Sequence, residues 1–178
     1  MSYFRKRALL VLAAALLVVP SVARAGPSDA VPEATLEKQV RHELLLLPYY
    51  SVFDNLNFQV EGVHVTLTGQ VMNPTLKASA ERAVRRLEGV ESVANEIAVL
   101  PLSAHDDLIR WRMFHAIYGN SALHKYGVGA NRPIHIIVQH GHVTLLGVVL
   151  NEMDKTITSM AANRVPGVFS VSNQLRIG

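Results

Sequence analysis

The chain has no cysteine among its 178 residues. Disulfide bonds, a catalytic thiolate and a thiolate-bound metal ion are therefore excluded, and each domain must be stabilised by its own hydrophobic core. The sequence also lacks the H-E-x-x-H pair of zinc hydrolases, the G-x-S-x-G turn of serine hydrolases and a lysine-containing phosphate loop. We therefore expect a protein that is not an enzyme and that carries no cofactor.

Long apolar runs are equally scarce, and the one that stands out lies at the N-terminus. Basic residues 5–7 precede an uncharged apolar run over residues 8–19, and Ala23-Arg24-Ala25 has small residues where a signal peptidase reads the chain. The run would rise only about 18 Å as a helix, too short for a bilayer core of about 30 Å. We expect residues 1–25 to be a cleavable signal peptide and 26–32 a flexible N-terminus. Without a cysteine to receive a lipid, the exported protein is expected in the periplasm and not as a lipoprotein.

Neither sign of charge dominates once the expected signal peptide is set aside. The full sequence has 17 Lys and Arg against 14 Asp and Glu. Residues 1–25 hold four of the basic residues and no acid, which leaves 13 basic and 14 acidic residues. A chain so close to neutrality has no general field that would attract nucleic acid, and we expect no nucleic-acid partner.

What the sequence does contain is an internal repeat. At a shift of 78 residues, HVTLTGQVMN (64–73) aligns with HVTLLGVVLN (142–151), and GVESVAN (89–95) aligns with GVFSVSN (167–173). Fifteen positions are identical in this stretch. Upstream the shift falls to 73, so the second copy carries about five extra residues near 127–133. We interpret the copies as domains over residues 33–100 and 104–178, with a short linker that favours packing between them.

Each copy has the apolar pattern of an α-β-β-α-β domain. Apolar residues every three or four positions predict a helix over 34–47, and Asn73-Pro74 predicts the start of a second helix. Alternating apolar residues predict strands. The expected strands are 56–60, 63–68 and 92–99 in the first copy, and 134–138, 142–148 and 170–177 in the second.

The first helix of the second copy has a less regular pattern. Ser103 is expected to cap it, with Asp106 as the second residue of an approximate capping box. Leu108, Trp111 and Ile117 are expected on its inner face. For Trp111 and Phe114 the interface between the two domains, or anchoring at a membrane interface, stays open as well. The predicted fold class is α+β: two tandem two-layer α/β sandwiches, each a three-stranded sheet with two helices on one face.

The order of these features resembles the BON domain: a turn glycine, a V-x-L-x-G strand, a capped helix, then G-V-x-S-V-x-N. The shared structural residues are Gly62, Gly69, Gly89, Asn95, Gly141, Gly147, Gly167 and Asn173. The resemblance implies an exported protein of the osmotic-stress type that supports envelope integrity by binding phospholipid or another envelope component. It also implies that there are no catalytic residues. Asn95 and Asn173 are expected to brace the backbone, because a buried amide needs hydrogen-bond partners.

A basic stripe on the second helix of each copy is the candidate lipid- or envelope-binding surface. Basic residues near an anionic membrane contribute about 1 kcal/mol each. The candidates are Lys77, Arg82, Arg85, Arg86, Lys155 and Arg164. An ordinary solvated helix face is the alternative interpretation, since Glu81, Glu88 and Glu152 lie among them.

Histidines are concentrated in the second copy, where six of the eight lie between residues 103 and 143. His135, His140 and His142 are the best candidates for a metal site, although zinc needs three or four ligands and no metal is expected here. A pH-sensing role stays open. Two alternatives to envelope binding also stay open: a periplasmic chaperone-like protein that binds unfolded clients, and an oligomerisation module of an envelope assembly.

Overall fold

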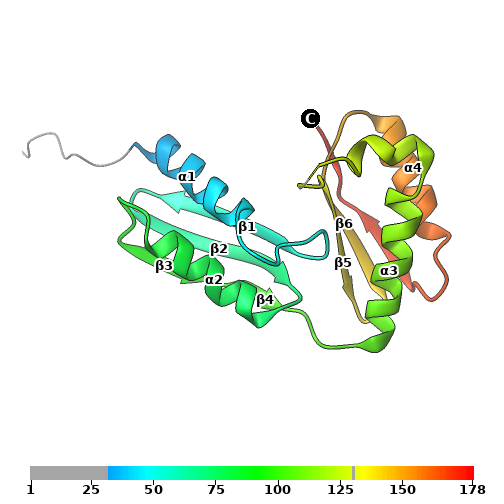
Figure 1. The fold of residues 1–178 in the computed structure, drawn as a ribbon, viewed down its shortest axis with the longest axis horizontal. Helices are drawn as coiled ribbons and strands as arrows, with labels where there is room; N and C mark the ends of the chain where they lie inside the picture. The colour runs from blue at the N-terminus through cyan, green and yellow to red at the C-terminus, as the bar shows by residue number, and fades with distance from the viewer. Residues whose placement is uncertain (1–31, 130) are drawn as a thin grey trace, which may run out of the picture.

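The computed structural model describes residues 32–129 and 131–178, which form two α/β domains in tandem (Figure 1). The signal peptide expected at residues 1–25, and residues 26–31 of the expected N-terminal segment, lie outside the described residues. Among the described helices, none has the length and apolar character that crossing a membrane requires.

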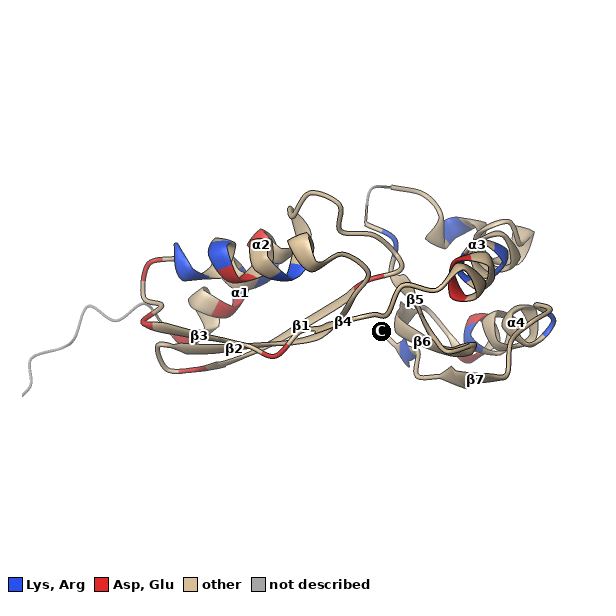
Figure 2. Cartoon of the chain, turned by 90° about the horizontal axis from the view of Figure 1, so that it is seen from below, with Lys and Arg blue, Asp and Glu red and all other residues tan. Residues whose placement is uncertain are grey.

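The first domain is built from two helices and a mixed sheet. Its β1 and β2 form an antiparallel hairpin, and its last two short strands both pair in parallel with β2. Helices α1 and α2 cover one face of the sheet, and the other face carries no helix (Figure 2). The elements are α1 (Glu33–Leu45), β1 (Asn55–Glu61), β2 (His64–Val71), α2 (Pro74–Arg85), β3 (Ser92–Asn95) and β4 (Ala98–Val99).

The second domain repeats this arrangement with one addition, a short 3-10 helix after its first helix. The elements are α3 (Ala104–Tyr118), η1 (Ser121–Tyr126), β5 (Ile134–Gln139), β6 (His142–Val149), α4 (Glu152–Asn163), β7 (Ser170–Asn173) and β8 (Arg176–Ile177). The 3-10 helix lies in the part of the copy that is longer than its counterpart. The Tyr126 hydroxyl anchors it by donating to Asp154 of α4 at 2.6 Å, and Lys125 lies 2.7 Å from the same carboxylate.

The last strand of each domain is interrupted, where the sequence pattern predicted one continuous strand. In the first domain β3 ends at Asn95, whose side-chain oxygen accepts from the backbone N–H of Ile97. This local turn displaces the chain for two residues before β4 rejoins β2. Asn173 and Leu175 repeat the contact in the second domain. A side chain that satisfies its own neighbouring backbone competes with the strand ladder, which alternation in the sequence does not reveal.

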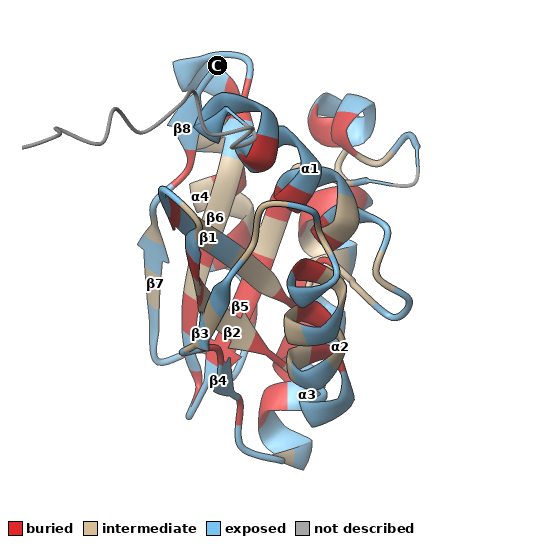
Figure 3. Cartoon of the chain, turned by 90° about the vertical axis from the view of Figure 1, so that its left-hand side faces the viewer, coloured by how far each residue is buried: buried red, intermediate tan, exposed pale blue. Residues whose placement is uncertain are grey.

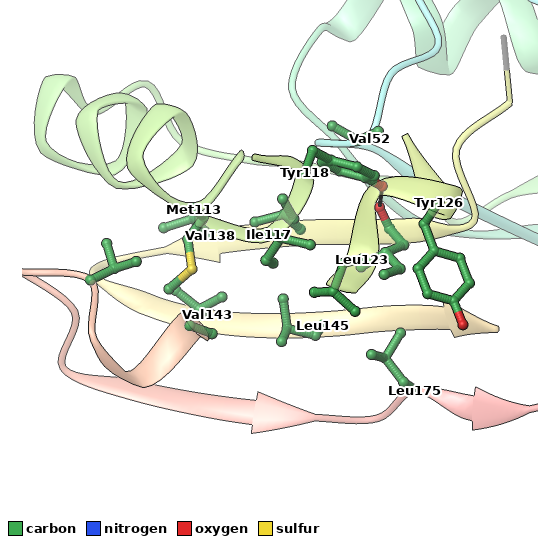
Figure 4. Packing of buried hydrophobic residues seen from close by; sticks show 14 of the residues in the cluster. Val52, Met113, Ile117, Tyr118, Leu123, Tyr126, Val138, Val143, Leu145 and Leu175 are labelled. Carbon is green, nitrogen blue, oxygen red and sulfur yellow. Dashed lines mark hydrogen bonds between the residues drawn. The ribbon is translucent and has the colours of Figure 1, made fainter. Parts of the chain in front are cut away.

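Each domain has its own hydrophobic core between sheet and helices (Figure 3). In the first domain Val65, Leu67 and Val71 of β2 are buried against Leu36 and Leu76 of the two helices. The equivalent residues of β6 are Val143, Leu145 and Val149, and they are buried in the same way (Figure 4). Alternate residues of the central strand therefore face the helices, as the spacing of two predicted.

The inner face of α3 differs from the sequence prediction. Ile109, Met113 and Ile117 are fully buried, whereas Leu108 and Trp111 are 47% and 60% exposed. Of the three predicted residues only Ile117 is inside. The reason is that α3 is apolar on more than one side, so that hydrophobic spacing alone does not single out the side that meets the sheet.

Two buried polar residues of α3 hold the end of the β5–β6 hairpin. Asp106 accepts hydrogen bonds from the backbone N–H groups of His140 and Gly141, at 2.9 and 2.8 Å. The Asp106 N–H donates to the Ser103 hydroxyl, which caps α3 as predicted. The Asp106 carboxylate binds the hairpin turn and so does not complete a capping box. Arg110 donates to the Val138 carbonyl at 2.6 Å. These contacts tie α3 to the turn that carries His140.

Candidate functional site

The basic residues proposed from the sequence lie on, or directly after, the second helix of each domain. Lys77, Arg82 and Arg85 belong to α2, and Arg86 follows it directly. Arg85 is paired with Glu81 at 2.7 Å, and Arg82 donates to Ser79 and to the Ala78 carbonyl of its own helix. Lys155 and Arg164 are associated with α4, at the far side of the second domain (Figure 2). The stripes of the two domains therefore lie on separate parts of the molecule.

The shared asparagines connect the second helix of each domain to the last strand. Asn95 donates to the Lys77 carbonyl at 3.1 Å, and Asn173 donates to the Lys155 carbonyl at 2.9 Å. In the first domain the Asn95 amide also donates to Glu81 at 3.1 Å. Both asparagines therefore contact backbone within their own domain.

The shared glycines lie at turns and close backbone approaches. Gly62, Gly89, Gly141 and Gly167 have positive φ angles at hairpin turns or after helices. Gly69 and Gly147 lie inside the central strands, with φ of 118° and 114°. A side chain at either of these two positions would overlap a backbone carbonyl.

The histidine candidates are divided between two hollows. His140 and His142 line one hollow between the sheets, and His135 lines another. Nowhere in the described ranges do three or more His, Cys, Asp or Glu side chains come close enough to hold a metal ion. His142 Nδ1 lies 2.7 Å from the Ser170 hydroxyl, and His64 makes the same contact with Ser92.

The domains meet through the segment between α1 and β1, which we call the junction loop (residues 46–54). Val52 of this loop is buried in the core of the second domain, beside Tyr118 (Figure 4). Its carbonyl accepts from the backbone N–H of Ile136 at 2.7 Å. Because Ile136 lies on edge strand β5, the first domain satisfies part of a strand edge that would otherwise be open.

Asp54 fixes the shape of the junction loop. Its carboxylate is buried and accepts from the backbone N–H and the hydroxyl of Ser51, at 3.0 and 2.7 Å. The other carboxylate oxygen accepts from the N–H of Met72, at the end of the first domain's sheet, at 2.8 Å. Asp54 therefore connects the junction loop both to itself, through Ser51, and to the sheet of the first domain, through Met72.

Beside the junction loop lies an aromatic groove of about 330 Å³. The Phe53 ring lies 6.4 Å from Trp111 and 6.3 Å from Phe114 of α3, so that both domains contribute to its walls. Its rim exposes large apolar side chains from both domains, because Leu45 is 42% and Trp111 60% accessible. The lining residues are Leu45, Tyr50, Ser51, Val52, Phe53, Trp111, Phe114, Asn131, Arg132 and His135.

The charge in this aromatic groove is positive. The Arg132 guanidinium stacks at 5.3 Å over the Phe114 ring and at 5.5 Å over Tyr118, and no acidic residue lines the groove. Burial raises the pKa of Tyr50 to about 12, and the nearby Asp54 charge adds to the shift, so its hydroxyl is neutral at physiological pH. An anionic or amphipathic ligand would therefore meet a single cation among aromatic surfaces.

Sequence reasoning did not identify this groove. Phe53 and Arg132 carried no motif, and Trp111 was assigned either to the inner face of its helix or to the interface between the domains. The one available signal was that the second copy's first helix carries more apolar residues than a single buried face needs.

Burial lowers the pKa of His135 below its ordinary value of 6.5. The backbone of Asp54 and Ser51 acts in the opposite direction and raises this pKa, but its effect is smaller than that of burial. The His135 Nδ1 atom is buried without a hydrogen-bond partner, and its ring lies 5.6 Å from Tyr50 of the junction loop. A depressed pKa in the folded state favours the neutral form. The associated stability is fully present above pH 6.5 and is lost as the pH falls below it, through the folded-state pKa.

We therefore expect the free energy of unfolding to decrease from pH 7.5 to pH 5.5, partly through His135. Urea titrations at the two pH values measure it. The decrease should be smaller in His135→Gln and unchanged in His124→Gln, whose side chain is exposed in the same domain. An identical decrease in all three proteins would show that His135 does not contribute.

The family model for the BON domain matches residues 32–101 and again residues 120–178. The chain belongs to the BON domain family. The second match begins after α3, whereas the first includes α1, so the helix that carries Trp111 is the part of the second BON domain that the family pattern does not cover. Membership of this family, which is non-catalytic, indicates an envelope- or stress-related role.

Other comparisons add little to the BON assignment. No curated protein matches the chain. Two structures of CdsD, a structural protein of the type III secretion system of Chlamydia trachomatis, are 14% identical to it. They cover 83% and 80% of this chain, with 100% and 92% of their own length matched and TM-scores of 0.30 and 0.29. Similarity at this level carries no information about function.

Proposed function

We propose that this protein is a non-enzymatic periplasmic binding protein that uses the aromatic groove at its domain junction to engage anionic phospholipid. The observation that carries the proposal is the exposure of large apolar side chains around a groove that holds a cation and no acid. Membrane interfaces favour such a combination, because aromatic side chains partition into the headgroup region and Arg attracts anionic lipid.

The exposed apolar residues extend beyond the groove itself. Leu46 and Tyr49 of the junction loop are 64% and 81% exposed, and Leu108 lies one helical turn before Trp111 on α3. Their exposure is costly in water unless something covers them, and an apolar patch of this kind marks an interaction surface. In the proposal, the acyl region of the lipid removes these apolar side chains from water.

The basic residues of α2 support the same orientation on a membrane. Helices α1 and α2 cover the same face of the first sheet (Figure 2), and α1 ends at Leu45, on the rim of the groove. Arg82, Arg85 and Arg86 are exposed on this helical side. In the proposal they add attraction to anionic headgroups, which salt would weaken.

The single tryptophan makes the proposal directly testable. Addition of vesicles of phosphatidylglycerol and phosphatidylcholine should shift the emission of Trp111 to shorter wavelength, since its ring would leave water. Co-sedimentation should weaken about fivefold in Arg132→Ala, because one basic residue near an anionic surface is worth about 1 kcal/mol. The α2 triple variant Arg82→Ala/Arg85→Ala/Arg86→Ala should reduce binding and its salt sensitivity.

Met160→Ala is the matched control, because Met160 is an exposed apolar side chain on α4. Its binding should equal that of the unaltered protein. Unchanged Trp111 emission with every vesicle composition would contradict the proposal. Suppression of aggregation of an unfolded client, without vesicle binding, would assign the groove to chaperone-like activity instead.

A further inference from the structure

The helix-free faces of the two sheets meet at an angle and enclose a second hollow, which we call the amide trough. Figure 2 shows the helices of the first domain above its sheet and those of the second domain beside theirs, which leaves a corner between the uncovered faces. The hollow has a volume of about 520 Å³. It is lined by Asn55, Asn57, Gln70, Ile137, Gln139, His140, His142, Thr144, Leu146 and Gln174.

The chemistry of this lining is unusual in its uniformity. It contains five side-chain amides, two imidazoles and one hydroxyl, and it contains no Asp, Glu, Lys or Arg. Each amide presents both a donor and an acceptor, as does the hydroxyl of Thr144. Ile137 and Leu146 supply the apolar part, and Ile137 is only 6% exposed although it lies on the face without helices.

The walls of the amide trough are held in place by contacts from outside it. Asp106 fixes the turn that carries His140 by accepting two backbone hydrogen bonds. Ser170 fixes the ring of His142 at 2.7 Å. The contact between Val52 and Ile136 sets the first sheet against the second. A site built on such supported elements requires little ordering when a ligand binds.

We propose that the amide trough binds a neutral glycan strand of N-acetylated sugars. Sugar hydroxyls and acetamido groups alternate donors with acceptors, which matches a lining made of amides, imidazoles and a hydroxyl. Ile137 and Leu146 pack against the apolar face of a sugar ring or against an acetamido methyl. Pockets at domain interfaces with a few convergent polar groups over an apolar base are common ligand sites.

The lining disfavours the two other ligands that an envelope protein could meet. A phospholipid headgroup would find no cation in the trough, in contrast to the aromatic groove. A peptide that adds as a strand needs a free sheet edge. Of the two edge strands that line the trough, β5 has its edge occupied by Val52, by Arg110 and by the Tyr118 hydroxyl, which donates to the Ile134 carbonyl, so strand addition is restricted to β1. The trough is therefore a site distinct from the lipid surface.

Nuclear magnetic resonance titration of the intact protein with chitotetraose, four linked N-acetylglucosamine units, tests the proposal. The side-chain NH₂ signals of Asn57 and Gln139 should shift and saturate. The double variant Asn57→Asp/Gln139→Glu keeps the shape of both side chains and removes their donors, and it should bind at least tenfold more weakly. Both residues are exposed, so thermal unfolding should confirm that the variant is folded.

Gln39→Glu on α1 is the matched control, since it makes the same amide-to-acid change on an exposed surface outside the trough. It should bind chitotetraose as the unaltered protein does. Cellotetraose, which lacks the acetamido groups, should bind more weakly. Absence of saturable shifts, equal affinity of the double variant, or saturation by a neutral tetrapeptide in place of the sugar would overturn the proposal. Vesicle binding is measured separately, by the emission of Trp111. The outcome of the chitotetraose titration therefore neither supports nor contradicts the lipid proposal.

Discussion

Replacement of Gly147 by alanine is expected to unfold the second domain. Gly147 lies inside β6 with a φ of 114°, a conformation that side-chain-bearing residues rarely adopt. An alanine Cβ would overlap the carbonyl oxygen of Pro133, a backbone atom at the start of the neighbouring strand. Backbone cannot give way as a flexible side chain can. Strain and steric overlap together should cost about 4 kcal/mol or more, a loss that few single substitutions cause.

Urea unfolding followed by far-ultraviolet circular dichroism measures the effect in both domains, and Trp111 emission reports the second domain by itself, since the single tryptophan lies there. The matched control is Gly62→Ala at a hairpin turn. Gly62 has a φ of 62°, but no atom lies within 4 Å of the position its Cβ would take. The control should lose only about 1–2 kcal/mol, the cost of a left-handed conformation. Similar losses in both variants would show that the overlap at Gly147 is relieved by movement of β5.

A charge at Val65 should unfold the first domain. Val65 is 1% exposed at the centre of β2 and packs between the sheet and the helices. Val65→Asp would bury a carboxylate with no partner, which costs several kcal/mol or forces the domain to open. Thr66→Asp is the control, because the next residue of the strand points to the helix-free face. Its loss should be within about 1 kcal/mol, as is usual for substitutions outside the core.

Hydrogen–deuterium exchange shows which of the two domains unfolds in Val65→Asp. In Val65→Asp, the amides of β1, β2 and α2 should lose protection first. Part of β5 should follow, because the N–H of Ile136 depends on the carbonyl of Val52 in the junction loop. Full protection of Ile136 with an unfolded first domain would show that the junction loop stays docked on its own. Normal melting of Val65→Asp would contradict the assigned facing of β2.

The fold could be predicted because its signals are local and occur twice. His64 to Thr68 and His142 to Leu146 have the same alternation, and each is followed by an asparagine that caps a helix. Strand facing, helix starts and the order of the elements along the chain follow from such short-range patterns. Only the structure shows that β2 and β6 lie at the centre of their sheets, each paired with an antiparallel and a parallel neighbour.

Predictions for single elements were wrong where a residue had two competing partners. Leu108 and Trp111 were expected on the inner face of α3, with the interface between the domains as the alternative for Trp111. Trp111 lies at that interface and faces the junction loop, because α3 serves two interfaces and its apolar residues are divided between them. Asp106 was expected to complete a capping box, but its carboxylate binds the hairpin turn of His140 and Gly141. Each partner lies more than 30 residues away in the sequence, where no spacing rule connects it.

The basic residues of α2 and α4 illustrate a different difficulty. Lys77 and Arg86 align with Lys155 and Arg164 in the repeat, so the sequence placed a basic stripe on the second helix of each domain but did not say whether the two stripes share one surface. Duplication preserves the position of a residue within its domain, but it does not define how the two domains are oriented. Because the second domain is turned relative to the first, equivalent helices lie on separate parts of the molecule (Figure 2).

The sequence by itself determined that this protein is a tandem pair of α+β domains without thiol chemistry, because composition and short-range periodicity carry that information. Only the tertiary structure decided where it could bind. The aromatic groove combines the junction loop with α3, and the amide trough combines Asn57 of β1 with Gln139 of β5. Both hollows depend on the angle between the domains. That angle follows from a few contacts, above all Val52 in the second core, whose individual residues look like ordinary loop or core residues in the sequence.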